Sequence, residues 1–312
     1  MNGFRPDMSV DIGGFKMKNP VMTASGAFGY GSEYADFVDL NLLGGVGVKC
    51  LTLEPRKGNP PPRICETPSG MLNTIGLQNV GVDAFLSDKL PYLRSFDTAV
   101  LVNLSGNTVN EYENICRLID EADGVHGIEL NVSCPNIDKG GMAFGVDAEA
   151  LETLVSKCKE ASDLPVIVKL TPNVTDIAAM AEACEKAGAD GLSLINTLLG
   201  MSIDVSTRRP NLSRVVGGLS GPAVKPIALR MVWEVSRAVS LPIIGMGGIM
   251  NAEDALEFIL AGASAVAVGT ANFTNPRASV EIVEEMERYF RESRVSCVDD
   301  FRGQLLIDDE GE

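Results

Sequence analysis

Histidine is almost absent from this sequence, which has His126 alone among 312 residues, and it has no Cys-x-x-Cys pair. One histidine cannot build a histidine-based triad or a cluster of imidazole metal ligands. Without closely spaced cysteines, no zinc or iron–sulfur site is expected in this chain. Acid–base chemistry near neutral pH must therefore use cysteine, lysine, a carboxylate or a bound cofactor.

Other features that the sequence lacks indicate the compartment of the protein and the classes of partner it does not bind. The seven cysteines are an odd number without paired short spacings, which fits a reducing compartment and no disulfide framework. No signal peptide is recognised, and no apolar run is long enough to cross a bilayer. The net charge of −16 argues against nucleic acid or an anionic membrane as a partner. We therefore expect a cytoplasmic protein.

The hydrophobic residues, 45% of the chain, recur in short apolar runs that alternate with segments of helical period. Eight parallel strands separated by helices favour a closed (β/α)8 TIM barrel, a single domain over residues 1–312, with a doubly wound open sheet as the alternative. Residues 1–19 predict a hairpin that covers one end of the barrel. The expected strands are Val21–Ser25, Gly45–Leu51, Ala99–Leu104, Gly127–Cys134, Val166–Leu170, Gly191–Asn196, Ile243–Gly247 and Ala265–Gly269.

Amphipathic patterns lie between these strands and predict helices over Ala148–Ala161, Thr175–Ala187, Asn251–Ala261 and Ser279–Phe290. The second of these should begin with Thr175 as its N-cap and the third with Asn251. Three connections are too long for simple turns, and each follows the carboxyl end of a strand, the catalytic face of this architecture. We interpret them as unstructured lids and substrate walls. They are Leu53–Asn79, Pro135–Gly145 and Leu198–Ser220.

The stretch Gly127–Asn136 carries the most reactive group. Its strand should stop at Cys134, because Pro135 lacks an N–H and restricts the residue before it. A thiol is then placed where a loop begins. Cys134 could be a small buried apolar residue, but other strands also end in polar groups. We favour a catalytic thiol, because a cysteine can act as a base when nearby charge favours the thiolate.

Polar side chains and glycines gather at the other strand ends. Asparagines there could cap turns, but together they offer donors and acceptors for a flat heterocycle. Lys49 and Lys169 could lie at the surface, but each is placed in an apolar strand, where an unpaired lysine is costly. Glycine pairs after strands seven and eight could be tight turns, yet that position is the usual phosphate site of barrels. A phosphate site, a flat-ring pocket and a lysine together suggest flavin mononucleotide (FMN), which would take a hydride.

These motifs resemble the class 1 dihydroorotate dehydrogenases over about residues 8–305. The similarity rests on Asn131-Val-Ser-Cys134-Pro-Asn136, Asn73-Thr-Ile-Gly-Leu77-Gln-Asn79, Lys49, Asn196-Thr197, Gly247-Gly248 and Gly269-Thr270. Position 134 is a cysteine rather than a serine, and in this the sequence resembles the soluble class 1 enzymes more than the membrane-associated class 2 enzymes. The stretches Ser25–Gly29 and Ile75–Asn79 resemble subclass 1B.

The resemblance implies oxidation of (S)-dihydroorotate to orotate in pyrimidine (UMP) biosynthesis. It also implies a partner subunit with FAD and a [2Fe-2S] cluster that passes electrons to NAD, and a homodimer within a heterotetramer. Cys134 would be the base, and Pro135–Gly145 a lid. Substrate contacts would come from Lys49, Asn73, Thr74, Ile75, Gly76, Leu77, Asn131, Asn196 and Thr197. FMN contacts would come from Ser25, Lys49, Cys50, Asn103, Asn131, Lys169, Ile195, Gly221, Gly247, Gly248, Gly269 and Thr270.

Two other interpretations stay open. The chain could resemble the homodimeric 1A type, which uses fumarate as the electron acceptor. It could also be a barrel that binds a phosphorylated ligand without catalysis, and it would then be colourless or carry a flavin that dihydroorotate does not bleach.

Overall fold

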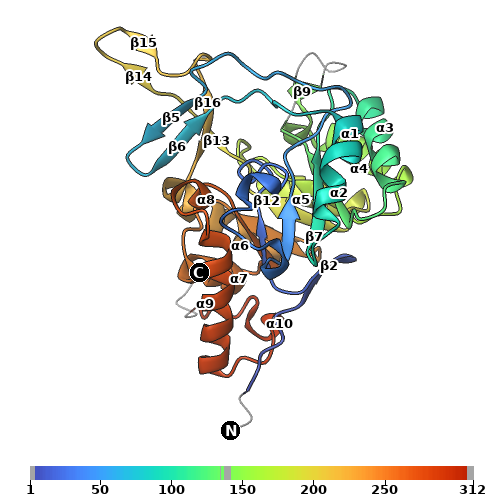
Figure 1. Cartoon of the computed structure of the whole chain (residues 1–312), viewed down its shortest axis with the longest axis vertical. Helices are drawn as coiled ribbons and strands as arrows, with labels where there is room; N and C mark the ends of the chain where they lie inside the picture. Colours follow the sequence, from blue (N-terminus) through green and yellow to red (C-terminus); the bar gives the residue numbers. More distant parts are fainter. Residues whose placement is uncertain (1–3, 134, 137–141, 308–312) are drawn as a thin grey trace.

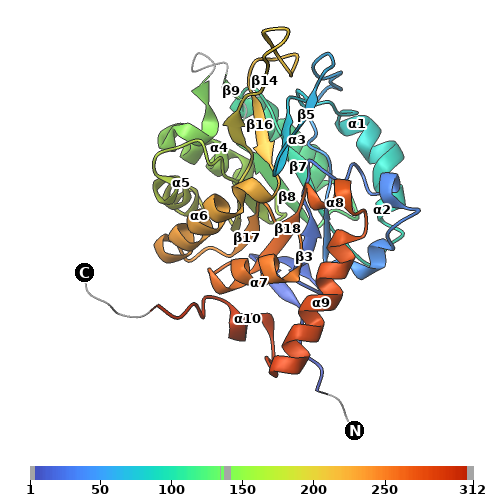
Figure 2. The ribbon, with the colours of Figure 1, turned by 90° about the vertical axis from the view of Figure 1, so that its left-hand side faces the viewer.

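The computed structural model describes residues 4–133, 135–136 and 142–307. Eight parallel strands close into a barrel in the order β11-β12-β17-β18-β3-β4-β7-β8 (Figure 2). Every residue in these strands is buried, as expected where helices cover the outer face. The predicted (β/α)8 barrel is confirmed. Its strands are β3 (Val21–Thr23), β4 (Gly45–Gly47), β7 (Ala99–Leu104), β8 (Gly127–Asn131), β11 (Val166–Lys169), β12 (Gly191–Leu194), β17 (Ile243–Met246) and β18 (Ala265–Val268).

Most of these strands end earlier than expected, and the difference matters most at β8. The strand was expected to reach Cys134, but it ends at Asn131. The hydroxyl of Tyr112 donates to the Asn131 carbonyl oxygen at 2.6 Å, and the Ser133 N–H donates to Asn131 Oδ1 at 3.3 Å. These hydrogen bonds lie at the point where the chain leaves the strand, which is several residues before Pro135. Cys134 itself lies outside the described residues.

Helices surround the barrel, and their apolar faces pack on the outer face of the strands. The main ones are α3 (Val109–Asp120), α4 (Ala148–Glu160), α5 (Ile177–Lys186), α6 (Lys225–Ala238), α7 (Ala252–Leu260) and α9 (Ala278–Ser293). Asn251 caps α7 as predicted, accepting from the Asp254 N–H at 2.9 Å. The cap predicted for α5 is wrong, because Asp176 rather than Thr175 accepts from the Ala179 N–H at 3.0 Å. Short helical segments are α1 (Val82–Ala84), η3 (Phe85–Lys89), α2 (Leu90–Leu93), α8 (Ala271–Thr274) and α10 (Val298–Phe301).

The predicted N-terminal hairpin is present and closes one end of the barrel. Strands β1 (Val10–Ile12) and β2 (Phe15–Met17) pair antiparallel. Ile12 and Phe15 have no exposed surface, and they pack with Leu101 and Ile167 from the barrel strands. In Figure 1, β2 lies at the end of the barrel opposite β5 and β6. Apolar side chains of the hairpin thereby fill the amino-terminal end of the barrel.

The prediction that the long connections are unstructured is wrong. Two of them, Leu53–Asn79 and Leu198–Ser220, supply a four-stranded antiparallel sheet, ordered β13-β16-β6-β5, above the carboxyl ends of the barrel strands (Figure 1). Pairing between segments far apart in sequence satisfies their backbone groups. The strands are β5 (Ile64–Thr67), β6 (Gly70–Asn73), β13 (Leu198–Gly200) and β16 (Gly217–Ser220), with two further pairs, β14 (Ile203–Asp204) with β15 (Arg209–Pro210) and β9 (Pro135–Asn136) with β10 (Met142–Ala143).

Candidate active site

A cavity of about 760 Å³ opens at the carboxyl ends of the barrel strands, beneath the antiparallel sheet. All the residues predicted for the site line it, except Cys134, which lies outside the described part of the chain. The lining includes Ser25, Lys49, Cys50, Asn73, Thr74, Ile75, Gly76, Leu77, Asn103, Asn131, Lys169, Ile195, Asn196, Thr197, Gly221, Gly247, Gly248, Gly269 and Thr270. The fold therefore brings together residues that are spread over most of the sequence.

Lys169 lies at the floor of this cavity, at the end of β11. It is 6% exposed, and its Nζ donates to Ser25 Oγ at 3.1 Å. The same Nζ lies 3.5 Å from Glu129 Oε2. The expectation of an unpaired lysine at this position is wrong, because the buried Glu129 carboxylate compensates its charge. The cost of an unpaired charge therefore does not by itself indicate function here.

Glu129 is the main residue that the sequence argument missed. Its side chain is 3% exposed, and it accepts from Ser193 Oγ at 2.7 Å and from Asn103 Nδ2 at 2.5 Å. The sequence feature that could have identified Glu129 is a carboxylate in the middle of the buried strand β8, where an unpaired charge would be costly. Its three partners come from three other strands, so no local pattern marks them.

One polar atom of Asn103, its Oδ1, indicates that the cavity binds a ligand. Its Nδ2 is used by Glu129, but its Oδ1 is buried and has no hydrogen-bond partner among the described residues. An acceptor of this kind is costly unless a donor reaches it. Because Asn103 lines the cavity, a ligand with a polar N–H edge could supply that donor.

A second polar group gathers where β8 and β12 end. Asn196 Nδ2 donates to Asn131 Oδ1 at 3.2 Å and to Ser133 Oγ at 2.8 Å. The Asn196 Oδ1 atom accepts from the Thr197 N–H at 2.8 Å. Asn131 Nδ2 in turn lies 3.8 Å from Cys50 Sγ. The amides hold each other in fixed orientations at the wall of the cavity.

Lys49 brings a second positive charge to the cavity. It is partly buried, and this burial lowers the pKa of its ammonium group. The neighbouring Cys50 opposes the shift, whereas Lys169 and Arg63 lower the pKa further by repulsion. A carboxylate ligand would relieve this repulsion, so Lys49 is suited to bind an anion.

The glycine turns after β17 and β18 form the far side of the cavity. At Gly248 the backbone has φ +79°, and an added Cβ would lie 2.8 Å from the Lys225 backbone nitrogen. At Gly269 an added Cβ would meet only Ala24 Cβ, at 3.5 Å. The first glycine is required by the fold itself, whereas the second leaves open space in the cavity wall. Thr270 Oγ1 donates to Ser220 Oγ at 2.8 Å beside this space.

The antiparallel sheet also forms part of the cavity wall. Ile64, Met71 and Leu219 line the cavity from this sheet. The sequence does not mark these residues as site residues, because their segments lack the apolar runs of the barrel strands and were expected to be loops. An apolar cover above polar strand ends is the usual composition of a pocket for a small organic ligand.

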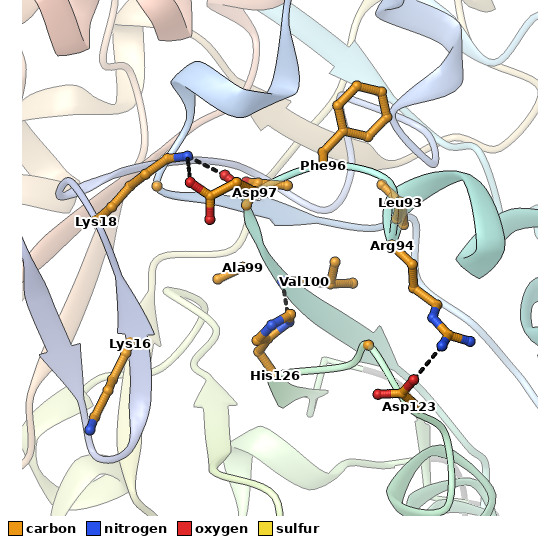
Figure 3. A pocket seen from close by; sticks show the side chains of 13 residues that line it. Lys16, Lys18, Leu93, Arg94, Phe96, Asp97, Ala99, Val100, Asp123 and His126 are labelled. Carbon is orange, nitrogen blue, oxygen red and sulfur yellow. Dashed lines mark hydrogen bonds and ion pairs between the residues drawn. The ribbon is translucent and has the colours of Figure 1, made fainter.

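A second cavity, of about 400 Å³, lies near the start of β7 (Figure 3). Two of its cations are paired, since Lys18 bonds to Asp97 at 3.0 Å and Arg94 bonds to Asp123. His126 Nδ1 accepts from the Val100 N–H at 3.1 Å. Burial lowers the pKa of this imidazole. The cavity is at the amino-terminal end of the barrel, where residues usually serve stability rather than catalysis.

Within 4–133, 135–136 and 142–307, no group of three or more His, Cys, Asp or Glu side chains could hold a metal ion. No helix in the same ranges is long and apolar enough to span a membrane.

Comparisons with known proteins agree with the barrel and with the motifs in its cavity. A family model described as dihydroorotate dehydrogenase matches residues 7–290. The catalytic subunit of dihydroorotate dehydrogenase B (NAD(+)) from Citrifermentans bemidjiense is 58% identical over 303 residues, covering 97% of this chain and 99% of that protein. The subunits of the same description from Desulforamulus reducens and Thermoanaerobacter sp. are 59% and 53% identical, over 95% and 97% of this chain and 98% and 100% of theirs. This chain therefore belongs to the dihydroorotate dehydrogenase family.

Proposed function

We propose that this protein oxidises (S)-dihydroorotate to orotate, a step of pyrimidine (UMP) synthesis, with FMN bound in the 760 Å³ cavity. The observation that carries the proposal is the convergence of the motif residues on one cavity of a barrel whose family is dihydroorotate dehydrogenase. When bound, FMN supplies the acceptor for a hydride, which no side chain can provide.

The residues of the cavity fit this cofactor. The free Asn103 Oδ1 would accept from an N–H of the flavin ring. Lys169, fixed by Ser25 and Glu129, would place positive charge beside the ring. The open backbone at Gly269, with Gly247, Gly248, Gly221 and Thr270, would hold the phosphate. Ser25, Lys49, Cys50, Asn131 and Ile195 complete the proposed FMN contacts.

The substrate would lie beside the amide cluster. Asn131, Asn196 and Thr197 hold one another and can present donors and acceptors to the pyrimidine edge. Lys49 would bind the carboxylate. The stretch Asn73–Leu77, which begins at the last residue of β6 and lines the cavity, would cover the substrate.

We assign the proton transfer to Cys134, on the sequence alone. Its thiolate would take the C5 proton of dihydroorotate while the C6 hydride leaves the substrate. Ser133, the residue before Cys134 in the sequence, contributes to the amide cluster at the cavity wall. The segment Pro135–Gly145 is proposed as the lid that excludes water.

We also propose an electron-transfer partner subunit with FAD and an iron–sulfur cluster, NAD as the final acceptor, and a homodimer of this chain within a heterotetramer. The support is that the relatives are described as NAD(+)-type catalytic subunits, which favours NAD over fumarate.

The experiment is to release the cofactor from purified protein by heat and identify it, then to assay dihydroorotate oxidation with two acceptors. The proposal expects FMN, and NAD reduction only when the partner subunit is added. A protein without flavin contradicts the cofactor assignment. Efficient fumarate reduction by this chain alone contradicts the partner and supports the 1A alternative.

A further inference from the structure

Four buried side chains from four adjacent barrel strands form one network under the active-site cavity. Glu129 on β8 contacts Asn103 on β7, Lys169 on β11 and Ser193 on β12. The sequence motifs of the site do not include Glu129, and Asn103 and Lys169 line the cavity while Glu129 does not. Glu129 therefore acts on any cavity ligand through its neighbours.

The first neighbour is Lys169. The side chains of Lys169 and Glu129 are 7% and 3% exposed, and Lys169 Nζ lies 3.5 Å from Glu129 Oε2. Replacing a buried ion pair by apolar residues is often neutral or stabilising, so stability alone does not explain such a pair. An ammonium group with a carboxylate behind it presents a smaller net positive charge to the cavity than an uncompensated one would.

The second neighbour is Asn103. An ionised carboxylate only accepts hydrogen bonds, so it requires the Nδ2 side of the Asn103 amide to face it, at 2.5 Å. The opposite atom, Oδ1, is then turned away as an acceptor without a partner among the described residues. The charge on Glu129 thus sets which edge of Asn103 is offered to a ligand.

The remaining carboxylate oxygen is held by Ser193, whose Oγ donates to Oε1 at 2.7 Å. Both oxygens of Glu129 are therefore occupied, and the side chain is fixed within the barrel. This is the geometry expected of a support behind the residues that touch a ligand.

We infer that Glu129 is a positioning residue of the cofactor site, which fixes the acceptor edge of Asn103 and limits the positive charge that Lys169 presents to the flavin. The inference rests on the proposed FMN site. Removing the carboxylate charge leaves Lys169 uncompensated beside a ring that becomes more negative on reduction. The reduced form is then stabilised, and the midpoint potential rises.

The test is the two-electron midpoint potential of bound FMN, measured anaerobically, in the wild type and in Glu129→Gln. We expect an equilibrium constant for reduction at least tenfold larger, a rise of about 30 mV or more. We also expect FMN to bind the apo-protein at least threefold more weakly, because a glutamine amide no longer fixes the orientation of Asn103. The matched control is Asp190→Asn. The Asp190 carboxylate pairs with Lys159 at 2.6 Å and accepts from the backbone N–H of Val166, the first residue of β11. This substitution should leave both quantities close to those of the wild type.

Lys169→Gln tests whether the effect passes through Lys169. In that background, Glu129→Gln should change the potential by less than a third of its effect in the wild type, because the cation is already absent. An equal change in both backgrounds overturns the role assigned to Lys169. A Glu129→Gln shift no larger than that of Asp190→Asn overturns the inference as a whole.

If Glu129→Gln does not fold, Glu129→Asp replaces it. It keeps the charge but is one methylene shorter, so it cannot hold Asn103 and Ser193 together. We expect a wild-type potential with FMN bound at least threefold more weakly, and unchanged affinity overturns the positioning role. If the wild type itself binds no FMN, the proposed function fails, and that result is separate from every variant comparison.

Discussion

Asn196 Nδ2 donates to Asn131 Oδ1 at 3.2 Å, although the two residues are 65 positions apart in the chain. They meet because β12 and β8 both pair with β11 in parallel, so their carboxyl ends lie at the same end of the barrel. The same geometry collects the other polar strand ends. The active site is thus a consequence of strand direction rather than of local sequence.

Cys134→Ala tests the proposed base. We expect FMN to stay bound and flavin reduction by dihydroorotate to slow by on the order of 10²-fold or more, the usual loss for a general base. Anaerobic stopped-flow absorbance measures the rate. Cys297→Ala, which changes a cysteine outside the cavity, should reduce at the wild-type rate. A near-normal rate in Cys134→Ala removes this thiol from the mechanism.

Lys169→Ala should lower both stability and flavin affinity. The substitution leaves the Glu129 carboxylate buried without its cation, which costs about 3–5 kcal/mol of unfolding free energy. Lys186→Ala is the control, since its bond to Glu152 lies at the surface and is worth about 1 kcal/mol or less. Denaturant unfolding and FMN titration measure the two effects. Equal stability losses in the two variants would show that the Lys169–Glu129 pair is not energetically important.

Orotate binding should depend on the charge of Lys49. Burial lowers the pKa of this ammonium group, so it loses its proton at a lower pH than an ordinary lysine does. The protonated form attracts the orotate carboxylate, and affinity should therefore fall as the pH rises through the lowered pKa. Lys49→Arg, which stays charged, should keep its orotate affinity over the same alkaline range. Titrations between neutral pH and about pH 10 measure this, and an identical pH profile for the two proteins contradicts the assignment.

Gly269→Ala separates folding from phosphate binding. An added Cβ meets only Ala24 Cβ at 3.5 Å, so the apo-protein should keep its stability. The methyl group would occupy the space proposed for the phosphate, and FMN affinity should fall by about tenfold or more, ~1.4 kcal/mol. In contrast, Gly248→Ala should also destabilise the apo-protein, because of the positive φ and the contact with the Lys225 backbone. Unchanged FMN affinity in Gly269→Ala would remove this turn from the phosphate site.

The sequence predicted the barrel because each barrel strand is a short apolar run, and such runs are visible locally. It predicted the cavity lining through motifs at the strand ends. It did not predict β6 and β16, since Met71 pairs with Ser220 across nearly half of the chain. It also missed Glu129, whose meaning depends on partners in three other strands. The single-domain assignment over residues 1–312 stays a prediction.

The most direct test of the central claim is the absorbance spectrum of the purified protein before and after anaerobic addition of (S)-dihydroorotate. The claim is that one cavity holds both FMN and this substrate. We predict a flavin spectrum whose visible band is bleached by dihydroorotate and restored by an electron acceptor. A colourless protein that cannot be loaded with FMN, or a flavin band that dihydroorotate leaves unchanged, would contradict it.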